Sequence, residues 1–167
     1  MIETIEFKGH IYPKFQASGN AARFIYPFAQ EVCKGRGVDI GCSKKEWCFP
    51  GAICVDIDFE DGYDAFNLPD GGFDYIFSSH CLEHIPNWAG ALDYWTERLV
   101  SYGVLFLYLP DESQIYWRPY HNRKHVHQFN RTVIEDYLKY SGAYSQWFIS
   151  NVDLNNSFAV MAQKRYF

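Results

Sequence analysis

Long apolar segments, positive charge and paired cysteines are scarce or missing in this sequence. The apolar runs are far shorter than the roughly 20 residues that cross a bilayer, and the first ten residues, MIETIEFKGH, do not form a secretory signal pattern. The formal net charge of −5 at pH 7 disfavours binding to the phosphate backbone of nucleic acids. These absences predict a cytoplasmic protein with no membrane and no nucleic acid partner.

The cysteines also lack the spacing of a metal or disulfide framework. Their number is odd and no two are spaced as C-x-x-C; they are Cys33, Cys42, Cys48, Cys54 and Cys81. The sequence therefore predicts reduced thiols.

Hydrophobic and aromatic residues are abundant, at 48% and 19% of the 167 residues. A chain of this length suits one domain with a sizeable core, and no linker, repeat or charged tail divides it. We predict a single domain over residues 1–167. Residues 1–36 would form an N-terminal arm and helix, and residues 111–129 an insertion that covers the substrate.

Continuous apolar runs indicate four parallel strands that are covered on both faces; they span residues 37–41, 52–57, 73–78 and 103–109. Helical patterns occupy residues 20–34, 87–101 and 130–141. Asn20 and Asn130 stand at N-cap positions, and Pro27 predicts a kink in the first helix.

Two further strands are expected near residues 145–153 and 157–164. Asn155-Asn156 between them suits a tight antiparallel hairpin. Alternation of strands and helices, followed by this hairpin, predicts an α/β fold. The expected architecture is a Rossmann-like, doubly wound, mostly parallel sheet with a C-terminal antiparallel hairpin.

Two connections in this sheet are too short for full helices. Residues 43–50 allow one or two turns, and only six positions separate Asp58 from Asp64 (64 − 58 = 6), fewer than the roughly dozen that a parallel crossover requires. We therefore predict truncated helices after strands one and two. The sheet face left partly uncovered is a candidate homodimer surface.

The segment GVDIGCSKKEWCFPGAICVDID, residues 37–58, carries the clearest ligand signal. Its two strands deliver Asp39, Gly41 and Asp56 to the carboxyl edge of the sheet, where ligands bind in such folds. Gly41 permits a sharp turn, and Asp56 is placed to accept both hydroxyls of a ribose. No G-x-G-x-x-G loop is present to cradle a pyrophosphate. A nucleoside without phosphates is the ligand expected.

Successive motifs resemble those of class I S-adenosylmethionine-dependent methyltransferases. They are GVDIGCS, VDID, YDAFNLPDGGFDYIFSSHCLEHI and GVLFLYLPDE, and the resemblance covers residues 37–165. The chain is particularly similar to the small-molecule branch that carries an L-E-H segment after strand four. The resemblance implies S-adenosylmethionine as the cofactor.

The same resemblance implies which residues contact the cofactor. Asp39, Gly41 and Cys42 would line its methionine part, Asp56 would bind the ribose, Ile57 would pack on the adenine, Asp64 and the Ala65 backbone would lie at the adenine amine, and Ser79 would follow strand four. Two plainer interpretations remain open. Asp56 and Asp58 are solvated strand-end acids in one of them, and Asp64 is a turn residue in the other.

The residues after strand four indicate the class of methyl acceptor. Enzymes that methylate exocyclic amines carry an acid or amide, then Pro-Pro and an aromatic residue, whereas this chain has Ser78-Ser79-His80-Cys81. O-methylation of a small acceptor, of sugar or sugar-nucleotide type, is therefore predicted. His80 and His84 are the candidate catalytic residues, with His80 as first choice for the general base. The alternative is that His80 only forms a hydrogen bond to cofactor or backbone.

His80, Glu83 and His84 also raise the question of a metal ion. The segment resembles the one that supplies a divalent-metal site in quinone-pathway O-methyltransferases, but the first position there is acidic. A histidine at that position disfavours magnesium, which seeks oxygen ligands. The sequence prediction is that no metal is bound.

The insertion at residues 111–129 combines aromatic and cationic side chains, which suit a planar or glycosidic substrate with a phosphate or carboxylate. Its candidate substrate-binding residues are Tyr116, Arg118, Tyr120, His125 and His127. The alternative is a solvated loop whose aromatic residues pack on the sheet. A zinc site built from its histidines is disfavoured because no cysteine or acid lies nearby in the sequence.

Three other functions remain open from the sequence. One is a catalytically inert subunit that binds S-adenosylmethionine, and another is a metal-assisted phenolic O-methyltransferase. The third is a nucleotide-binding module with no role in methyl transfer.

Overall fold

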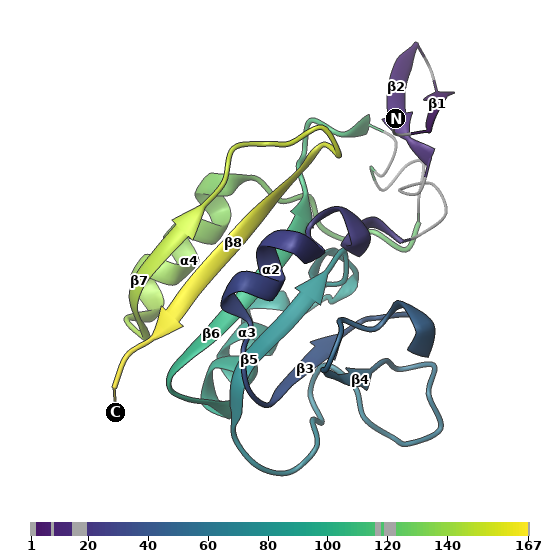
Figure 1. Ribbon diagram of the computed structural model, residues 1–167. Helices are drawn as coiled ribbons and strands as arrows, with labels where there is room; N and C mark the ends of the chain where they lie inside the picture. The colour runs from purple at the N-terminus through teal and green to yellow at the C-terminus, as the bar shows by residue number, and fades with distance from the viewer. Residues whose placement is uncertain (1–2, 8, 15–19, 116–117, 119–122, 167) are drawn as a thin grey trace.

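The computed structural model describes residues 3–7, 9–14, 20–115, 118 and 123–166 (Figure 1). A six-stranded sheet forms its centre, in the order β4-β3-β5-β6-β8-β7. The strands are β3 (Gly37–Ile40), β4 (Ile53–Val55), β5 (Phe73–Ser79), β6 (Leu99–Pro110), β7 (Tyr144–Ile149) and β8 (Ser157–Lys164).

The pairing of these strands gives a mostly parallel sheet. β4, β3, β5 and β6 run parallel, so that Val38 of β3 lies between Ile53 and Ile76. β8 pairs antiparallel with β6, and β7 antiparallel with β8. The predicted Rossmann-like fold with a C-terminal antiparallel pair is confirmed.

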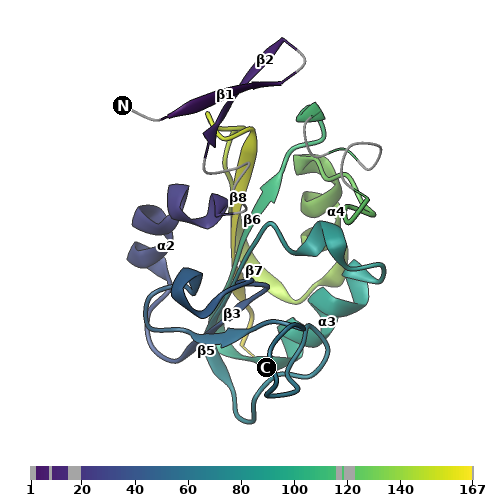
Figure 2. The same ribbon diagram turned by 90° about the vertical axis from the view of Figure 1, so that its right-hand side faces the viewer.

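Helices cover the two faces of the sheet unequally. α2 (Tyr26–Val32) lies on one face, while α3 (Trp88–Arg98) and α4 (Arg131–Ser141) lie on the other (Figure 2). On the α2 face, Phe77 stacks between Phe49 and Phe106, with ring centroids 4.5 and 5.6 Å apart. These rings fill space that a longer helix would otherwise cover. Within the described part of the chain, no helix is long and apolar enough to span a membrane.

The two short connections are confirmed. β3 is followed by a single 3-10 turn, η2 (Lys45–Trp47), and residues 56–72, between β4 and β5, contain no helix. The connections from β3 to β4 and from β4 to β5 therefore consist of loops without a full helix.

The first predicted helix, residues 20–34, is interrupted in the structure. A 3-10 turn, η1 (Ala21–Phe24), ends at Ile25, and α2 begins at Tyr26. Pro27 lies in the first turn of α2 instead of kinking a longer helix, because it has no N–H to continue one. Asn20 makes no capping hydrogen bond with its side chain, so the predicted cap was wrong.

The other two helices begin as the sequence indicated. The Asn87 side chain accepts from the Gly90 N–H at 3.2 Å and begins α3, but that helix ends at Arg98 and not near residue 101. The difference arises because Leu99 already pairs with Phe73 in the sheet. α4 matches its prediction, with Asn130 accepting from the Val133 N–H at 3.0 Å and Gly142 in the left-handed conformation.

The C-terminal strands are antiparallel as predicted, but their connection is wider than a two-residue turn. β7 ends at Ile149 and β8 begins at Ser157. The Asp153 carboxylate accepts the N–H groups of Asn155 and Ser157 at 2.8 and 3.2 Å. An aspartate-centred turn thus replaces the predicted Asn155-Asn156 hairpin.

The N-terminal arm contains a hairpin that the sequence analysis did not predict. β1 (Thr4–Phe7) pairs antiparallel with β2 (His10–Pro13) in a separate two-stranded sheet. A separate 3-10 turn, η3 (Leu82–His84), follows the carboxyl end of β5. It leads toward the site described below.

Candidate active site

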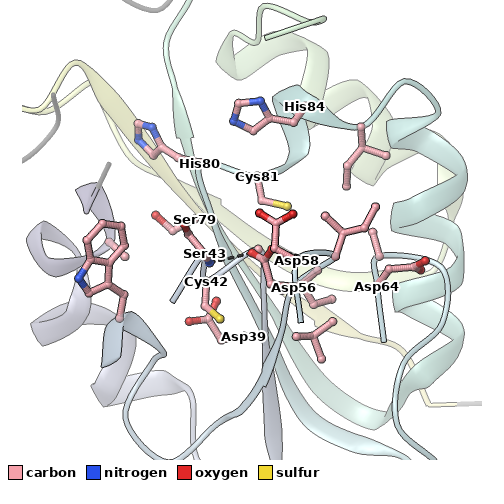
Figure 3. Close-up of a pocket in the computed structure, with 18 of the residues that line it drawn as sticks. Asp39, Cys42, Ser43, Asp56, Asp58, Asp64, Ser79, His80, Cys81 and His84 are labelled. Atoms are coloured by element: carbon pink, nitrogen blue, oxygen red, sulfur yellow. Dashed lines mark hydrogen bonds between the residues drawn. The ribbon is translucent and has the colours of Figure 1, made fainter. Parts of the chain in front are cut away.

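A cavity of about 710 Å³ opens at the carboxyl ends of β3, β4 and β5 (Figure 3). Its size is in the range of small-molecule sites. All of the residues predicted to contact a cofactor line it: Asp39, Gly41, Cys42, Asp56, Ile57, Asp64, Ala65 and Ser79. His80, His84 and His125 line it as well. The structure therefore brings most of the predicted site residues to one place.

Gly41 forms the turn beneath the cavity and cannot be replaced without strain. Its φ is +84°, and a Cβ there would lie 2.3 Å from the Cys81 Sγ. Its N–H donates to the Val55 carbonyl at 2.8 Å, which ties the ends of β3 and β4 together. Glycine is required here by both backbone conformation and close packing.

Asp39 is buried at the end of β3 and anchors the short segment that follows. Its Oδ2 accepts the Phe49 N–H at 2.7 Å. Burial raises the pKa of Asp39 to about 7, which the Phe49 hydrogen bond opposes and the nearby Asp56 charge reinforces. One oxygen of this side chain therefore holds the protein's own backbone, although the residue also lines the cavity.

Asp56 follows β4 and orders the loops at its edge of the cavity. Its Oδ2 accepts the Ser43 N–H at 2.7 Å, drawn as a dashed line in Figure 3, and its Oδ1 accepts the Asp58 N–H at 3.1 Å. Each carboxylate oxygen keeps a second lone pair for a ligand hydroxyl. Asp56 is thus more than a solvated acid at the end of a strand.

The wall beyond Asp56 is apolar and open. Ile57 and Phe66 both line the cavity, with 80% and 47% of their surface exposed. Asp64 Oδ1 accepts the Phe66 N–H at 2.7 Å, so Asp64 does shape a turn as well as line the cavity. The Ala65 carbonyl accepts a hydrogen bond from Trp95 Nε1 at 2.7 Å.

The end of β5 closes the cavity with polar groups. Ser79 Oγ is buried without a hydrogen-bond partner. His80 has a left-handed φ of +49°, which is uncommon for a residue with a side chain, and its Nε2 lies 3.0 Å from Ser157 Oγ. Burial lowers the pKa of His80 to about 3, with the charges of His125 and His84 acting in the same direction. This imidazole is neutral at physiological pH.

Glu83 and three histidines form a cluster beside this wall. Glu83 is fully buried, and neither carboxylate oxygen has a hydrogen-bond partner. Its Oε1 lies 3.9 Å from a ring nitrogen of each of His80, His84 and His125. Burial raises the pKa of Glu83 to about 8. The sequence analysis considered Glu83 only alongside His80 and His84.

The insertion at residues 111–129 contributes fewer cavity residues than predicted. His125 and its neighbour Lys124 line the cavity. Arg118 instead donates to the Glu112 carbonyl through Nε and a terminal nitrogen, at 3.2 and 3.0 Å, and His127 Nε2 lies 3.0 Å from the Pro86 carbonyl oxygen. Neither of these two side chains lines the cavity. The other predicted substrate residues, Tyr116 and Tyr120, lie outside the described residues.

Comparison with known protein families shows to which family the chain belongs. A family model described as a methyltransferase domain matches residues 17–144, most of the chain. The chain belongs to the methyltransferase domain family. The resemblance of its motifs to class I S-adenosylmethionine-dependent methyltransferases is thereby confirmed.

Solved structures show the same fold at low sequence identity. N-methyltransferase NodS from Bradyrhizobium japonicum WM9, in complex with S-adenosyl-L-homocysteine, is 13% identical with a TM-score of 0.59, covering 90% of this chain and 88% of that one. A SAM-dependent methyltransferase from Archaeoglobus fulgidus is 18% identical (TM-score 0.58; 86% and 95% covered). An O-methyltransferase family protein from Burkholderia thailandensis is 11% identical (TM-score 0.59; 90% and 60% covered). No curated protein sequence matches the chain.

S-adenosylmethionine is the cofactor of this methyltransferase domain, and the cavity fits it. The left-handed turn at Gly41 leaves the floor free of a side chain, and Asp56 retains lone pairs for hydroxyl groups. The unpartnered Ser79 Oγ offers a buried polar contact. The exposed Ile57 provides apolar surface of the kind that a purine ring covers.

The methyltransferase cavity also has residues that the sequence analysis missed. Asn20, Trp47 and Lys124 all line it, and the Asn20 Oδ1 is buried without a hydrogen-bond partner. Asn20 was interpreted as a helix cap because it precedes a helical pattern. The helix fails to form there, and the side chain turns out to be part of the cavity wall.

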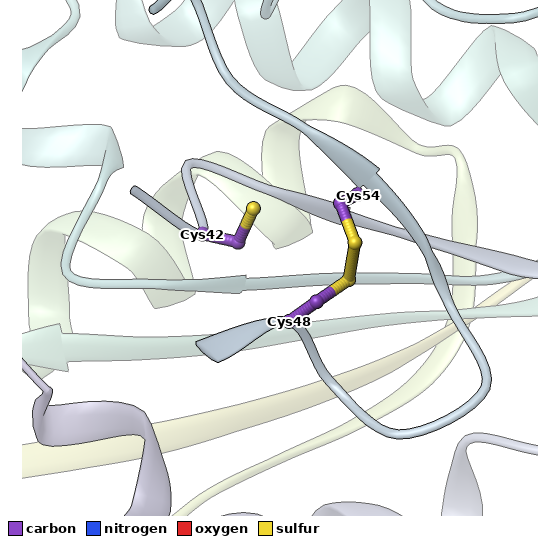
Figure 4. A group of neighbouring side chains, drawn as sticks. All are labelled: Cys42, Cys48 and Cys54. Atoms are coloured by element: carbon purple, nitrogen blue, oxygen red, sulfur yellow. A yellow bond between two sulfur atoms is a disulfide. The ribbon is translucent and has the colours of Figure 1, made fainter. Parts of the chain in front are cut away.

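The cysteines of this domain are not all reduced, which corrects the sequence prediction. Cys48 and Cys54 form a disulfide across the short β3–β4 connection, with Cα atoms 5.6 Å apart (Figure 4). Cys42, a free thiol, has its Sγ within 4.8 Å of both. The spacing C-x₅-C gave no signal because a disulfide depends on how the connection folds back.

Proposed function

We propose that this methyltransferase transfers a methyl group to an oxygen atom of a small acceptor of sugar or sugar-nucleotide type. The observation that carries the proposal is the chemistry of the cavity wall at the end of β5. His80, His84 and Lys124 stand there, in place of the acid or amide that would orient an exocyclic amine.

On this proposal, the donors, acceptors and apolar side chains of the cavity determine how the cofactor binds. Asp56 binds the ribose hydroxyls, and Ile57 and Phe66 enclose the adenine, with Asp64 and Ala65 at its edge. Asp39, Gly41, Cys42 and Ser79 line the methionine portion. The bound cofactor supplies an electrophilic methyl group, so the protein has mainly to align the acceptor and exclude water.

His84 is better placed than His80 to accept the acceptor's proton. The pKa of about 3 makes His80 a weak base at neutral pH, and its Nε2 is engaged with Ser157. Burial also lowers the pKa of His84, but its ring is partly exposed, and its Nδ1 lies 2.8 Å from the Lys124 carbonyl oxygen. That contact places the N–H on Nδ1 and leaves Nε2 as the basic atom.

The loop of residues 123–129 binds the acceptor on this proposal. Lys124 and His125 lie at the cavity, and a cationic side chain there suits a phosphate or carboxylate group. Tyr116, Arg118, Tyr120 and His127 belong to the same insertion and stay predicted substrate contacts from the sequence alone, since Arg118 and His127 bond to the Glu112 and Pro86 carbonyls.

We further propose that two copies of the chain associate through the α2 face of the sheet. Phe28 of α2 and Phe148 of β7 are exposed there, and their rings lie 6.2 Å apart. An apolar patch of this kind, where the sheet has fewer covering helices, suits a second apolar surface.

The cofactor assignment is tested by calorimetric titration with S-adenosylhomocysteine. We expect micromolar binding by the wild-type chain, at least about 10-fold weaker binding by Asp56→Ala because hydrogen bonds to a charged group are lost, and no binding of NAD. Asp70→Ala is the matched control, since Asp70 is an exposed aspartate that does not line the cavity.

Two results would contradict the proposal. One is the absence of S-adenosylhomocysteine binding at millimolar concentration. The other concerns the acceptor: formation of S-adenosylhomocysteine with amine acceptors, and none with sugar or sugar-nucleotide hydroxyls, would exclude O-methylation.

A further inference from the structure

Glu83 is the most unusual side chain in the described part of the chain. It has no exposed surface, and both of its carboxylate oxygens lack a hydrogen-bond partner. A buried carboxylate without partners costs several kcal/mol as an ion, so native proteins rarely leave one in this condition. Buried carboxylates of this kind in proteins are commonly paired with a cation or coordinate a metal ion.

Imidazole rings surround this carboxylate at a distance too long for hydrogen bonds. Glu83 Oε1 lies 3.9 Å from His84 Nε2 and 3.9 Å from His125 Nε2. One ligand atom from each of the three residues lies within 4.8 Å of the other two. His80 Nδ1 is also 3.9 Å from Glu83 Oε1, on the side of β5.

The spacing suits a central ion. Zinc bonds of about 2.1 Å that meet at the tetrahedral angle place two ligand atoms about 3.4 Å apart. The distances from Glu83 Oε1 to the two histidine nitrogens would need to shorten by about half an ångström to close on an ion of this size.

The rings are already held in the orientation that ligands require. His84 Nδ1 contacts the Lys124 carbonyl oxygen at 2.8 Å, so its N–H points away and Nε2 faces Glu83. His80 Nε2 contacts Ser157 Oγ at 3.0 Å and leaves Nδ1 toward Glu83. Metal-bound histidines use their second nitrogen in this way, which sets tautomer and ring direction.

The backbone also locks the two halves of the cluster together. The Glu83 carbonyl accepts the N–H groups of Val126 and His127, at 2.9 and 3.1 Å. These bonds fix the loop that carries His125 against the turn that carries Glu83 and His84. The ligand atoms thus come from segments about 40 positions apart in the sequence, on a rigid support.

We propose that Glu83, His84 and His125 bind one divalent transition ion of the zinc type through three protein ligands, with His80 beside the site and the fourth position open. Two imidazoles and one carboxylate form a donor set that suits zinc and other first-row ions better than magnesium. His84 and His125 line the cavity, so the ion lies at its wall with a side toward the acceptor. An oxygen of the acceptor is the ligand expected at that side. When the ion is bound it would occupy the lone pair of His84 Nε2, so the ion, by lowering the pKa of the acceptor hydroxyl, would replace His84 in promoting loss of the proton to solvent.

This site supplies what each half lacked in the sequence. The insertion histidines had no cysteine or acid nearby in the sequence, and the segment of His80, Glu83 and His84 lacked the acidic first position of a magnesium site. Folding joins them. The role of the ion in holding an acceptor oxygen rests on the proposed function, whereas ion binding itself does not.

The test is direct ion binding by the untagged, chelator-treated chain. Cobalt(II) is added as a spectroscopic probe and zinc is titrated by calorimetry. We expect one ion per chain, with visible bands of nitrogen and oxygen coordination. Binding should be about 100-fold weaker or more in Glu83→Gln and in His125→Ala. His127→Ala is the control, because His127 is in the same loop but bonds to Pro86.

Two checks keep the result unambiguous. Thermal unfolding shows whether each variant is folded, and the conservative Glu83→Gln keeps the volume of the side chain. A strong sulfur-to-cobalt band would place the ion on cysteine thiolates instead, such as Cys42 with Cys48 and Cys54 after reduction of their disulfide, and would overturn the proposal. Binding that survives both Glu83→Gln and His125→Ala would overturn it as well.

The experiments on ion binding and on cofactor binding test the two proposals separately. A chain that binds S-adenosylhomocysteine but no ion refutes the metal site and leaves the proposed function standing. A chain that binds one ion through Glu83 and His125 but no S-adenosylhomocysteine supports the metal site and refutes the proposed function.

Discussion

At Gly41, two separate constraints fall on one residue. Its backbone is left-handed, and the space where a Cβ would stand is occupied by the Cys81 side chain. The Cys81 side chain therefore packs directly against Gly41. The floor of the cavity therefore requires a residue without a Cβ at position 41.

Replacing Gly41 by alanine should lower the free energy of unfolding by about 2–4 kcal/mol, combining left-handed strain with overpacking. Gly51→Ala is the matched control. Gly51 has a similar φ of +86°, but nothing lies within 4 Å of its missing Cβ, so it should lose only about 1–2 kcal/mol. Denaturant unfolding measures both variants. Equal losses would show that the contact with Cys81 is unimportant.

Among the elements, the β3–β4 connection shows how a shortened βαβ unit remains ordered. η2 has only three residues, too few to pack a helix on the sheet. Asp39 binds the Phe49 N–H from below, and the Cys48–Cys54 disulfide closes the segment. A buried side-chain hydrogen bond and a covalent link thus do the work of the missing helix.

Asp39 should make stability depend on pH. Its pKa of about 7 in the folded chain exceeds that of an unfolded aspartate, so the folded state binds the proton more tightly. Its contribution is fully present below pH 4 and is lost as pH rises to about 7. The pKa difference corresponds to about 4 kcal/mol.

Asp39→Asn cannot ionise but can still accept the Phe49 N–H. We expect its stability relative to wild type to increase steadily between pH 4 and pH 8, measured by denaturant unfolding at each pH. Taking the difference between the two chains cancels the contributions of the other titrating groups. A difference that does not change with pH would refute the raised pKa.

For the molecule as a whole, the uneven cover of the sheet is the main feature. Among the described residues, α3 and α4 protect one face, and the single α-helix α2, with the short turn η1, lies on the other (Figure 2). Stacked phenylalanines fill part of the second face. The exposed Phe28 and Phe148 extend the same apolar surface toward solvent.

Phe148→Glu should convert a dimer to a monomer, because a charge at an apolar interface is costly to bury. Light scattering after size-exclusion chromatography would show the mass fall by half at micromolar concentration. Tyr140→Glu is the control, since Tyr140 is exposed on α4, across the sheet. A wild-type chain that is monomeric at these concentrations would refute the dimer.

Local patterns in the sequence determined much of the fold. Continuous apolar runs marked β3, β4, β5 and part of β6, because strands buried on both faces need apolar side chains at every position. Spacing alone showed that no helix fits between Asp58 and Asp64. The order of motifs identified the methyltransferase family and placed eight cofactor candidates, all of which line the cavity.

Only the tertiary structure decided where sequence-distant groups meet. The end of α3 depends on Leu99 pairing with Phe73, and the disulfide depends on the way the β3–β4 segment folds back. Glu83 meets His125 because Val126 and His127 bond to the Glu83 carbonyl. Such contacts leave no local pattern, since they arise from packing between segments whose separation in the sequence is arbitrary.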